Sequence, residues 1–368
     1  MGKVLMKGNE VIAEAAVQAG CNYFFGYPIT PQSELVAYMA RRLPEVGGLF
    51  LQAESEIAAI NMVYGAAGTG VRVMTSSSSP GFSLKQEGIS YLVGSELPAV
   101  VVNIVRGGPG LGNIQPAQSD YFQVTKGGGH GDYNIPVLAP ASLQEIVELT
   151  SEAFDIADRY RTPVILMGDG MLGQMMEPVE FGERTQPELP EKNWATTGTR
   201  GDGQRRIITS LELNAEALET RNEALQKKFA RIKENEVRYE IYQTGDADYI
   251  MVAFGTVARI TMNAIKKARQ QGLKVGLIRP ISLWPFPEKP FLETRDVVKG
   301  YISVEMSAGQ MVEDVRLAVN GHAEVDFYGR TGGVVPTQEE IYQKILSVTG
   351  GSRYDHENSF KKNKRINR

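Results

Sequence analysis

The sequence predicts an α/β protein with two units: a doubly wound parallel sheet, followed by a smaller α/β unit. Three observations support this prediction. Strand-like and helix-like segments alternate from residue 1 to about 170, they alternate again from Asp246, and a polar stretch with several prolines separates the two runs. Strands that alternate with helices indicate parallel sheets covered on both faces. A chain of 368 residues is long enough for two such domains.

The first run supplies the elements of the larger sheet. Its strand-like segments are 21–25, 49–52, 71–75, 98–105 and 163–167. The segments between them have the periodicity of helices: 9–19, 34–42, 55–67, 83–92 and 143–160. The run 98–105, Pro-Ala-Val-Val-Val-Asn-Ile-Val, is typical of a central strand covered on both faces. Ligands bind such sheets at the carboxyl ends of the strands, so the site is expected there.

The remainder of the chain predicts a connector and the second unit. Residues 171–208 contain several prolines and no sustained period, and 211–242 is charged and largely helical, with Glu223 and Lys227 spaced to pair on one face. Strands are expected at 249–254, 274–279, 301–305 and 325–328, and helices at 258–271, 310–319 and 337–348. The predicted domains are therefore 1–190 and 246–350, joined by a linker at 191–245 and followed by a basic tail at 351–368.

Composition excludes several classes of protein. The chain is 42% hydrophobic and 22% charged, which excludes wholesale disorder. Its net charge of −4 argues against a nucleic-acid-binding protein. No apolar run reaches the ~18 residues of a membrane span, and no signal peptide is recognisable, so a cytoplasmic location is expected. Cys21 is the only cysteine, and because an iron–sulfur cluster usually needs about four thiolates, any cluster must lie on another chain.

The loop Gly26-Tyr27-Pro28-Ile29-Thr30-Pro31 is the first candidate for a site. It lies between a strand and a helix, with Thr30 expected as the N-cap and Pro31 at the first helical position. The start of a helix stabilises anionic groups, so the loop is suited to an anion. The alternative is an ordinary strand-to-helix turn.

Glu56 and Arg106 are the candidate chemical groups. Glu56 follows Glu54 by two residues at the start of a helix, so the two carboxylates point to different faces. Ala59 and Ile60 mark the face of Glu56 as buried, and a buried carboxyl group can exchange a proton near neutrality. Arg106 ends a buried strand and can clamp a carboxylate. The alternatives are a helix-start acidic residue for Glu56 and a structural ion pair for Arg106.

Other motifs are weaker. Gly168-Asp169-Gly170 and Gly201-Asp202-Gly203 resemble the start of a diphosphate–magnesium motif, but neither is expected to open the helix that such a motif requires. The glycines at 107–112 do not match a dinucleotide fingerprint. His130 lies in a glycine-rich loop and is expected to be structural or incidental, and a short basic tail such as 361–365 is most often simply solvated.

Taken in order, several motifs resemble the alpha-type subunit of the 2-oxoacid:ferredoxin oxidoreductases, nearest to the branched-chain (2-oxoisovalerate) branch, with the 2-oxoglutarate branch next. The resemblance covers about residues 1 to 350. It is carried by Tyr-Pro-Ile-Thr-Pro at 27–31, Gln-Ala-Glu-Ser-Glu-Ile-Ala-Ala at 52–59, Met-Thr-Ser-Ser-Ser-Ser-Pro-Gly at 74–81, Arg-Gly-Gly-Pro-Gly at 106–110, Phe-Gly-Thr at 254–256, Leu-Trp-Pro-Phe-Pro at 283–287 and Val-Glu-Met-Ser-Ala-Gly-Gln-Met at 304–311.

This resemblance implies a pyrimidine-type thiamine-diphosphate-binding sheet and a second domain with a transketolase C-terminal fold. It implies oxidative decarboxylation of a 2-oxoacid, with coenzyme A collecting the acyl group and ferredoxin the electrons. The cofactor lies between two chains in this family. A beta subunit holds the diphosphate, Mg²⁺ and an iron–sulfur cluster, and gamma and small ferredoxin-like delta subunits complete the assembly.

The resemblance also implies roles for individual residues. Glu56 aligns with the glutamate that protonates the pyrimidine ring nitrogen, and Thr30 and Arg106 align with residues that hold the substrate carboxylate. Residues expected to line the cofactor are Tyr27, Pro28, Ile29, Ser78 and Ser79; no metal ligand is expected on this chain. Two other classes stay open: a subunit of a lipoamide-linked 2-oxoacid dehydrogenase, and a non-catalytic scaffold subunit.

Overall fold

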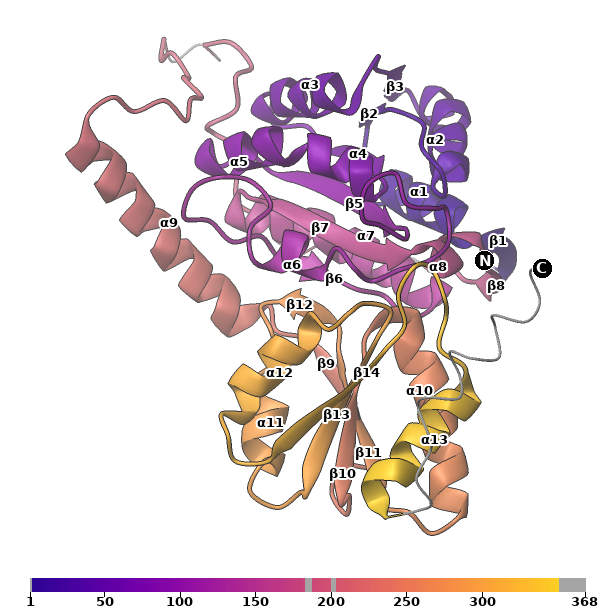
Figure 1. Ribbon diagram of the computed structural model, residues 1–368. Helices are drawn as coiled ribbons and strands as arrows, with labels where there is room; N and C mark the ends of the chain where they lie inside the picture. Colours follow the sequence, from indigo (N-terminus) through magenta and orange to yellow (C-terminus); the bar gives the residue numbers. More distant parts are fainter. Residues whose placement is uncertain (1, 183–186, 200–202, 351–368) are drawn as a thin grey trace.

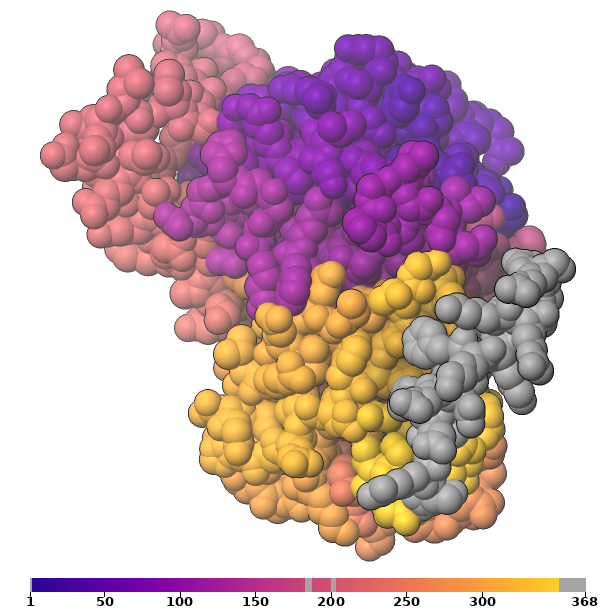
Figure 2. All heavy atoms as spheres, in the orientation of Figure 1, coloured from indigo at the N-terminus to yellow at the C-terminus, as the bar shows by residue number. Residues whose placement is uncertain are grey.

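The computed structural model describes residues 2–182, 187–199 and 203–350. It contains two main sheets, one above the other, each covered by helices (Figure 1). Figure 2 shows the two lobes packed directly against each other, with the segment around α9 standing out on one side. Among the described residues no helix is long and apolar enough to cross a membrane.

The larger sheet has the strand order β12-β6-β7-β5-β4-β2-β3. Its members are β2 (Tyr23–Gly26), β3 (Leu49–Gln52), β4 (Val73–Ser77), β5 (Ala99–Val105), β6 (Val137–Leu138), β7 (Pro163–Asp169) and β12 (Ser282–Trp284). All neighbours are parallel except β12, which runs antiparallel to β6. Every residue of β5 is buried, as its apolar run predicts for a strand covered on both faces.

Two layers of helix cover this sheet. One core cluster gathers residues of α1 (Gly8–Gln18), α2 (Ser33–Glu45) and α7 (Leu143–Tyr160) on one face. On the other face lie α3 (Glu56–Gly68), α4 (Ser79–Leu84) and α5 (Gln86–Gly94), with the short α6 (Tyr121–Thr125) beside the second unit. Ser142 caps α7 by accepting a hydrogen bond from the Glu145 N–H at 3.2 Å.

The region predicted as an irregular connector is more ordered than expected. It begins with α8 (Gly170–Gln174) and β8 (Met176–Val179), and β8 pairs antiparallel with β1 (Val4–Lys7). Neither strand was predicted, because each is only a few residues long and depends on the other for its backbone partners. The described part of the connector then leads to α9 (Ala215–Asn235), which Asn214 caps.

The prediction of helix over 211–242 was wrong at its end. Residues Tyr239–Tyr242 form β9, which pairs with β11 of the second sheet. The segment lies at the edge of the sheet, with none of its residues fully buried, and the neighbouring strand β11 supplies the partners that a helix would have found within itself. β9 falls within the range predicted as linker.

The second sheet has the order β14-β13-β10-β11-β9, parallel except at β9. Its other strands are β10 (Tyr249–Val252), β11 (Val275–Pro280), β13 (Gly300–Glu305) and β14 (Glu324–Gly329), and its helices are α10 (Gly255–Gln270), α11 (Lys289–Thr294), α12 (Met311–Val319) and α13 (Gln338–Thr349). Helices α10 and α13 cover one face, whereas α11 and α12 belong to a cluster that continues into the first unit.

Buried polar contacts also join the two units. The Tyr121 hydroxyl donates to Asp314 Oδ2 at 2.6 Å, and Gln118 Nε2 donates to the Phe254 carbonyl at 3.0 Å. The Thr256 hydroxyl donates to the Asp169 carboxylate. These contacts, with the continuous apolar cluster, fix the second unit beneath the carboxyl ends of β5 and β7.

Candidate active site

The predicted site residues come from four neighbouring strand ends of the larger sheet. Residues 27–30 follow β2, Glu56 follows β3, Ser78 and Ser79 follow β4, and Arg106 follows β5. Because β3, β2, β4 and β5 are adjacent and parallel, their carboxyl ends lie along one edge. The structure therefore brings the predicted residues to a common rim.

Arg106 is the link between the loops of this rim. Its Nη1 donates to the Thr30 carbonyl at 2.9 Å, and its Nη2 donates to the Leu111 carbonyl at 3.2 Å. Its backbone N–H donates to Ser79 Oγ at 3.0 Å. Arg106 is 8% exposed, its Nε has no partner, and no carboxylate pairs with it among the described residues. The alternative of a structural ion pair is therefore not supported.

Glu56 is the first residue of α3, where Ser55 caps the helix by accepting from the Ala58 N–H at 3.1 Å. The side chain of Glu56 is buried, with 6% of the residue exposed, while Glu54 is exposed. Within the part of the chain that the structure describes, the Glu56 carboxylate makes no hydrogen bond or ion pair. Gly81 faces it so closely that an added Cβ would clash with Glu56 Oε1 and Ser77 Oγ.

The serine loop contributes two unpartnered hydroxyls. Ser76 Oγ donates to Gln32 Oε1 at 2.6 Å, which ties the loop to the start of α2. By contrast, the hydroxyls of Ser77 and Ser78 are buried without a hydrogen-bond partner. Buried polar groups are normally paired, so these hydroxyls and the unpaired carboxylate of Glu56 suit a polar ligand at this edge.

The predicted cap at Thr30 was wrong. Helix α2 begins at Ser33 with Gln32 in the N-cap position, and Thr30 and Pro31 lie in the preceding turn. Asn9 Nδ2 and Gln174 Nε2 both donate to the Pro31 carbonyl, at 2.7 and 3.0 Å. These tertiary hydrogen bonds hold the carbonyl outside the helix, and propensity alone does not reveal them. Tyr27, Pro28 and Thr30 are exposed, and Ile29 is half-buried.

Lys85 is a polar residue of this region that the sequence did not single out. It is completely buried at the junction of α4 and α5, within a segment predicted as one helix. Its Nζ donates to Thr75 Oγ1 at 3.0 Å and approaches the main-chain oxygen of Glu56 at 3.5 Å. Burial lowers the pKa of Lys85 to about 8. The available signal was its spacing from Phe82 and Ile89, which places a lysine in an apolar stripe.

The discounted motif at 168–170 does open a helix, contrary to the expectation, but α8 is only 5 residues long. Asp169 accepts hydrogen bonds from the N–H groups of Met171 and Leu172 and from the hydroxyl of Thr256. Burial raises the pKa of Asp169. Its carboxylate is thus engaged within the chain, and no group of metal-ligating side chains occurs among the described residues.

Two further sequence features lie away from the rim or outside the description. His130 is exposed, and its ring lies 5.9 Å from the ring of Tyr91, with the edge of one ring toward the other. The motif at 201–203 lies largely outside the described residues, and the tail at 351–368 lies entirely outside them.

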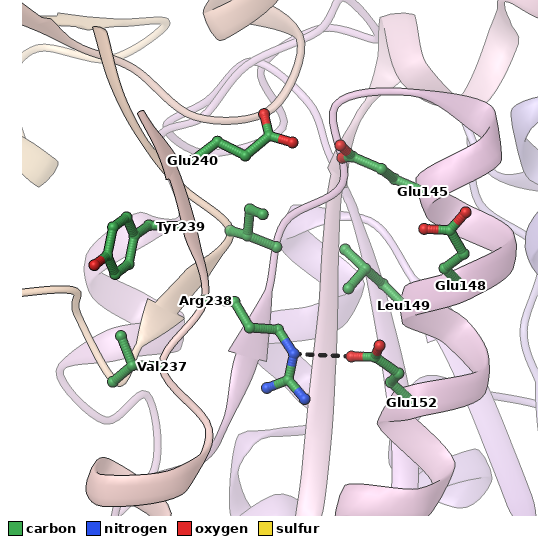
Figure 3. Close-up of a pocket in the computed structure, with 9 residues that line it drawn as sticks. Glu145, Glu148, Leu149, Glu152, Val237, Arg238, Tyr239 and Glu240 are labelled. Carbon is green, nitrogen blue, oxygen red and sulfur yellow. Dashed lines mark ion pairs between the residues drawn. The ribbon is translucent and has the colours of Figure 1, made fainter. Parts of the chain in front are cut away.

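A separate hollow of about 430 Å³ lies between α7 and β9 (Figure 3). It is acidic, and an ion pair joins Arg238 Nε to Glu152 Oε2 at 2.9 Å within it. Its other charged groups are Glu145, Glu148 and Glu240. None of the predicted site residues lines this hollow, so it is distinct from the rim.

A doubly wound sheet with an unpaired buried carboxylate at its carboxyl edge fits the thiamine-diphosphate-binding class. The family model described as pyruvate flavodoxin/ferredoxin oxidoreductase, thiamine diphosphate-binding, matches residues 14–240. The model of pyruvate:ferredoxin oxidoreductase core domain II matches residues 247–341. The chain belongs to the 2-oxoacid:ferredoxin oxidoreductase family, and the resemblance drawn from its motifs is confirmed.

Individual relatives refine this assignment. The chain is 51% identical to ketoisovalerate oxidoreductase subunit VorB of Methanothermobacter thermautotrophicus, over 96% of this chain and 99% of that protein. It is 40% identical to 2-oxoglutarate synthase subunit KorA of Archaeoglobus fulgidus, over 84% of this chain and 90% of that protein.

Solved structures agree with the fold. The 2-oxoglutarate:ferredoxin oxidoreductase from Magnetococcus marinus, with 2-oxoglutarate, coenzyme A and succinyl-CoA bound, matches with a TM-score of 0.84 at 28% identity. The match covers 94% of this chain and 65% of that one. A split-gene transketolase, solved as an inactive beta4 tetramer, matches with a TM-score of 0.57 at 13% identity, which supports the shared fold alone.

Proposed function

We propose that this chain supplies the pyrimidine-binding half of a thiamine diphosphate site. The observation that carries the proposal is the Glu56 carboxylate, which belongs to a residue only 6% exposed, is unpaired among the described residues and lies beside Gly81. A ring nitrogen within hydrogen-bond reach would satisfy it. The unpartnered hydroxyls of Ser77 and Ser78 supply further polar groups for the same ligand. Tyr27, Pro28, Ile29 and Ser79 are proposed to line it.

Each residue then has a stated task. Glu56 holds a proton at the ring nitrogen and exchanges it as the reaction proceeds. Bound thiamine diphosphate supplies the nucleophilic carbon and the electron sink for decarboxylation. Arg106 and Thr30 orient the carboxylate of the 2-oxoacid, since the Arg106 guanidinium is a cation without a carboxylate partner in the described chain.

The proposed reaction is coenzyme A-dependent oxidative decarboxylation of 2-oxoisovalerate, with ferredoxin as the electron acceptor. The higher identity to the VorB subunits, 51% and 50%, supports this substrate. The KorA relatives and the Magnetococcus structure make 2-oxoglutarate the second candidate. An assay of the co-purified complex against 2-oxoisovalerate, 2-oxoglutarate and pyruvate, with coenzyme A and a viologen acceptor, tests both. A preference for pyruvate would contradict the assignment.

The remaining parts of the enzyme are proposed to lie on partner chains. A beta subunit would hold the diphosphate, Mg²⁺ and an iron–sulfur cluster, with gamma and small delta subunits completing the complex, which is proposed to be cytoplasmic. Burial raises the pKa of Cys21, the only cysteine, to about 12, so this thiol is poorly suited to bind iron. We expect the isolated chain to contain no iron and to show no oxidoreductase activity. A cluster on the isolated chain would refute the division of parts.

A scaffold subunit without a catalytic role is the alternative from another class. It predicts that replacing Glu56 leaves turnover intact in the assembled complex. The unpaired carboxylate argues against it, because a purely structural carboxylate at a helix start would be expected to bond the helix N–H groups or a cation.

A further inference from the structure

Lys85 joins three elements directly behind the proposed site. It lies between α4 and α5, its Nζ donates to Thr75 Oγ1 on β4 at 3.0 Å, and the same nitrogen lies 3.5 Å from the main-chain oxygen of Glu56 on α3. The residue is 0% exposed. Lysine is almost never fully buried unless it is paired, so its presence here needs a reason.

No carboxylate forms an ion pair with Lys85 among the described residues, and Glu56 is the group whose charge acts on it most directly. The Lys85 ammonium group thus lies near Glu56, bonded to its main-chain oxygen and not to its carboxylate. A nearby cation favours the ionised form of a carboxyl group. The contact to the main chain of Glu56 also fixes the first turn of α3.

Other titratable groups on the surrounding elements have different partners. Glu54 is exposed, the Tyr64 hydroxyl bonds Ser95 Oγ at 2.6 Å, and Glu87 bonds the Tyr91 hydroxyl at the surface. On the side of β5, the guanidinium of Arg106 bonds two carbonyls, and Asp120 accepts from Asn103 Nδ2 at 2.9 Å.

We propose that Lys85 is a positioning residue that holds the first turn of α3 and places a cation behind Glu56. The proposal rests on the proposed function of Glu56. In this arrangement the lysine touches neither substrate nor cofactor. It acts through Glu56, whose backbone it contacts at 3.5 Å and whose carboxylate it keeps in place for the exchange of a proton with the ring nitrogen.

The test uses the assembled complex with Lys85→Met, Lys85→Arg and the matched control Lys228→Met. Lys228 is also a buried lysine, but it pairs with Glu96 and bonds the Arg161 carbonyl at the opposite ends of the strands. The readouts are the acidic limb of the kcat/KM pH profile and the near-ultraviolet circular dichroism of the bound cofactor.

We expect Lys85→Met to lower kcat on the order of tenfold and to move the acidic limb up by roughly one pH unit, as loss of a neighbouring opposite charge does. The dichroism of the bound cofactor should change over the same pH range. Lys85→Arg should restore most of both effects, and Lys228→Met should move neither readout. A purely structural Lys85 predicts lower stability without a shifted limb, which would overturn the proposal.

Glu56→Gln separates failure of this inference from failure of the proposed function. If Glu56→Gln abolishes turnover while Lys85→Met has a normal kcat and limb, only the role of Lys85 is overturned. If Glu56→Gln is fully active, the proposed function fails as well. Should Lys85→Met not assemble, Thr75→Val removes the hydroxyl partner and keeps the charge. It should lower kcat with an unshifted limb, and wild-type kcat in that variant would overturn the proposal.

Discussion

At the scale of single residues, Glu56 and Glu54 can be compared directly, because both lie at the start of α3, on either side of its N-cap Ser55. Both are glutamates, but Glu56 is 6% exposed at the rim and Glu54 is exposed to solvent. We expect Glu56→Gln in the assembled complex to cut ferredoxin reduction at least ~100-fold, the usual order for acid–base catalysis. Glu54→Gln is the matched control and should keep near-normal turnover. Equal effects of the two changes would refute a specific role for Glu56.

Gly81 provides a test of the approach between α4 and Glu56. A methyl group there would meet Glu56 Oε1 and Ser77 Oγ, so Gly81→Ala should displace the carboxylate and weaken thiamine diphosphate binding by tenfold or more, about 1.4 kcal/mol. Gly65→Ala is the control, since Gly65 lies in α3 with open space around it and should gain about 0.5–1 kcal/mol of stability. Titration of the complex with the cofactor measures the difference, and unchanged affinity in Gly81→Ala would contradict the geometry.

Arg106 offers a test of substrate orientation. Arg106→Gln removes the cation at the rim, so the KM for the 2-oxoacid should rise ~10- to 100-fold, in line with loss of a charge-assisted contact of 1.5–3 kcal/mol. The KM for coenzyme A should change little. Steady-state kinetics with each substrate varied in turn distinguishes the two. A rise confined to coenzyme A would assign Arg106 to a different ligand.

At the scale of elements, the junction of α4 and α5 makes stability depend on pH. The folded-state pKa of Lys85 is lowered to about 8 from 10.5, so the unfolded chain binds more protons between these values. The free energy of unfolding should therefore rise with pH across that window, by on the order of 3 kcal/mol for a shift of this size. Lys85→Met removes this contribution. Denaturant unfolding of the wild-type chain and of Lys85→Met at pH 8 and pH 10.5 measures how much each free energy of unfolding changes with pH. An equal change in the two proteins would contradict this prediction.

Some of these elements could be predicted from the sequence and others could not. Most strands of both sheets were predictable because their apolar runs and flanking helices have clear periods, and β5 is buried along its whole length. The short strands β6 and β12 of the larger sheet were not predicted. The shared rim followed from parallel topology alone. The turn at Thr30, the strand pair β1–β8 and β9 depend on partners distant in the sequence, such as the Asn9 amide bonded to the Pro31 carbonyl. Local propensity does not contain these contacts.

The serine loop at 76–79 also has contacts that the sequence alone does not predict. Four consecutive serines look equivalent in the sequence, yet Ser76 bonds Gln32, Ser77 and Ser78 are unpartnered, and Ser79 bonds the main chain of Arg106. Which hydroxyl is left for a ligand is decided by what packs around each one. The family resemblance identified the loop, and the structure distinguishes its members.

At the scale of the whole molecule, the two units are held together by buried polar contacts as well as by a continuous core. Gln118 is 2% exposed and belongs to the first unit. Its Nε2 donates to the Phe254 carbonyl at 3.0 Å, and its Oε1 accepts from the Met306 N–H at 3.0 Å. One side chain therefore bonds two elements of the second unit, and the chain is expected to unfold as one body.

Gln118→Ala tests this coupling. It leaves the Met306 N–H without its Gln118 partner and removes one of the two hydrogen bonds that the Phe254 carbonyl accepts, the other coming from the Ala258 N–H. An unpaired buried group costs about 1–3 kcal/mol. We expect a lower melting temperature in calorimetry and two resolved transitions in place of one. Gln226→Ala is the control, since Gln226 is exposed and bonds only the Asp132 carbonyl in the described structure. An unchanged single transition in Gln118→Ala would show that the apolar core alone joins the units.

The hydrogen bonds to the backbone of the 27–31 loop have a consequence for how this site responds to substitution. The fully buried Asn9 donates to the Pro31 carbonyl, and Arg106 donates to the Thr30 carbonyl. The path of the loop is thus set by residues other than those it displays. The side chains of Tyr27, which is 36% exposed, and of the half-buried Ile29 make none of the hydrogen bonds that fix that path. We therefore expect a substitution at either position to alter the proposed contact with the cofactor and leave the course of the backbone unchanged.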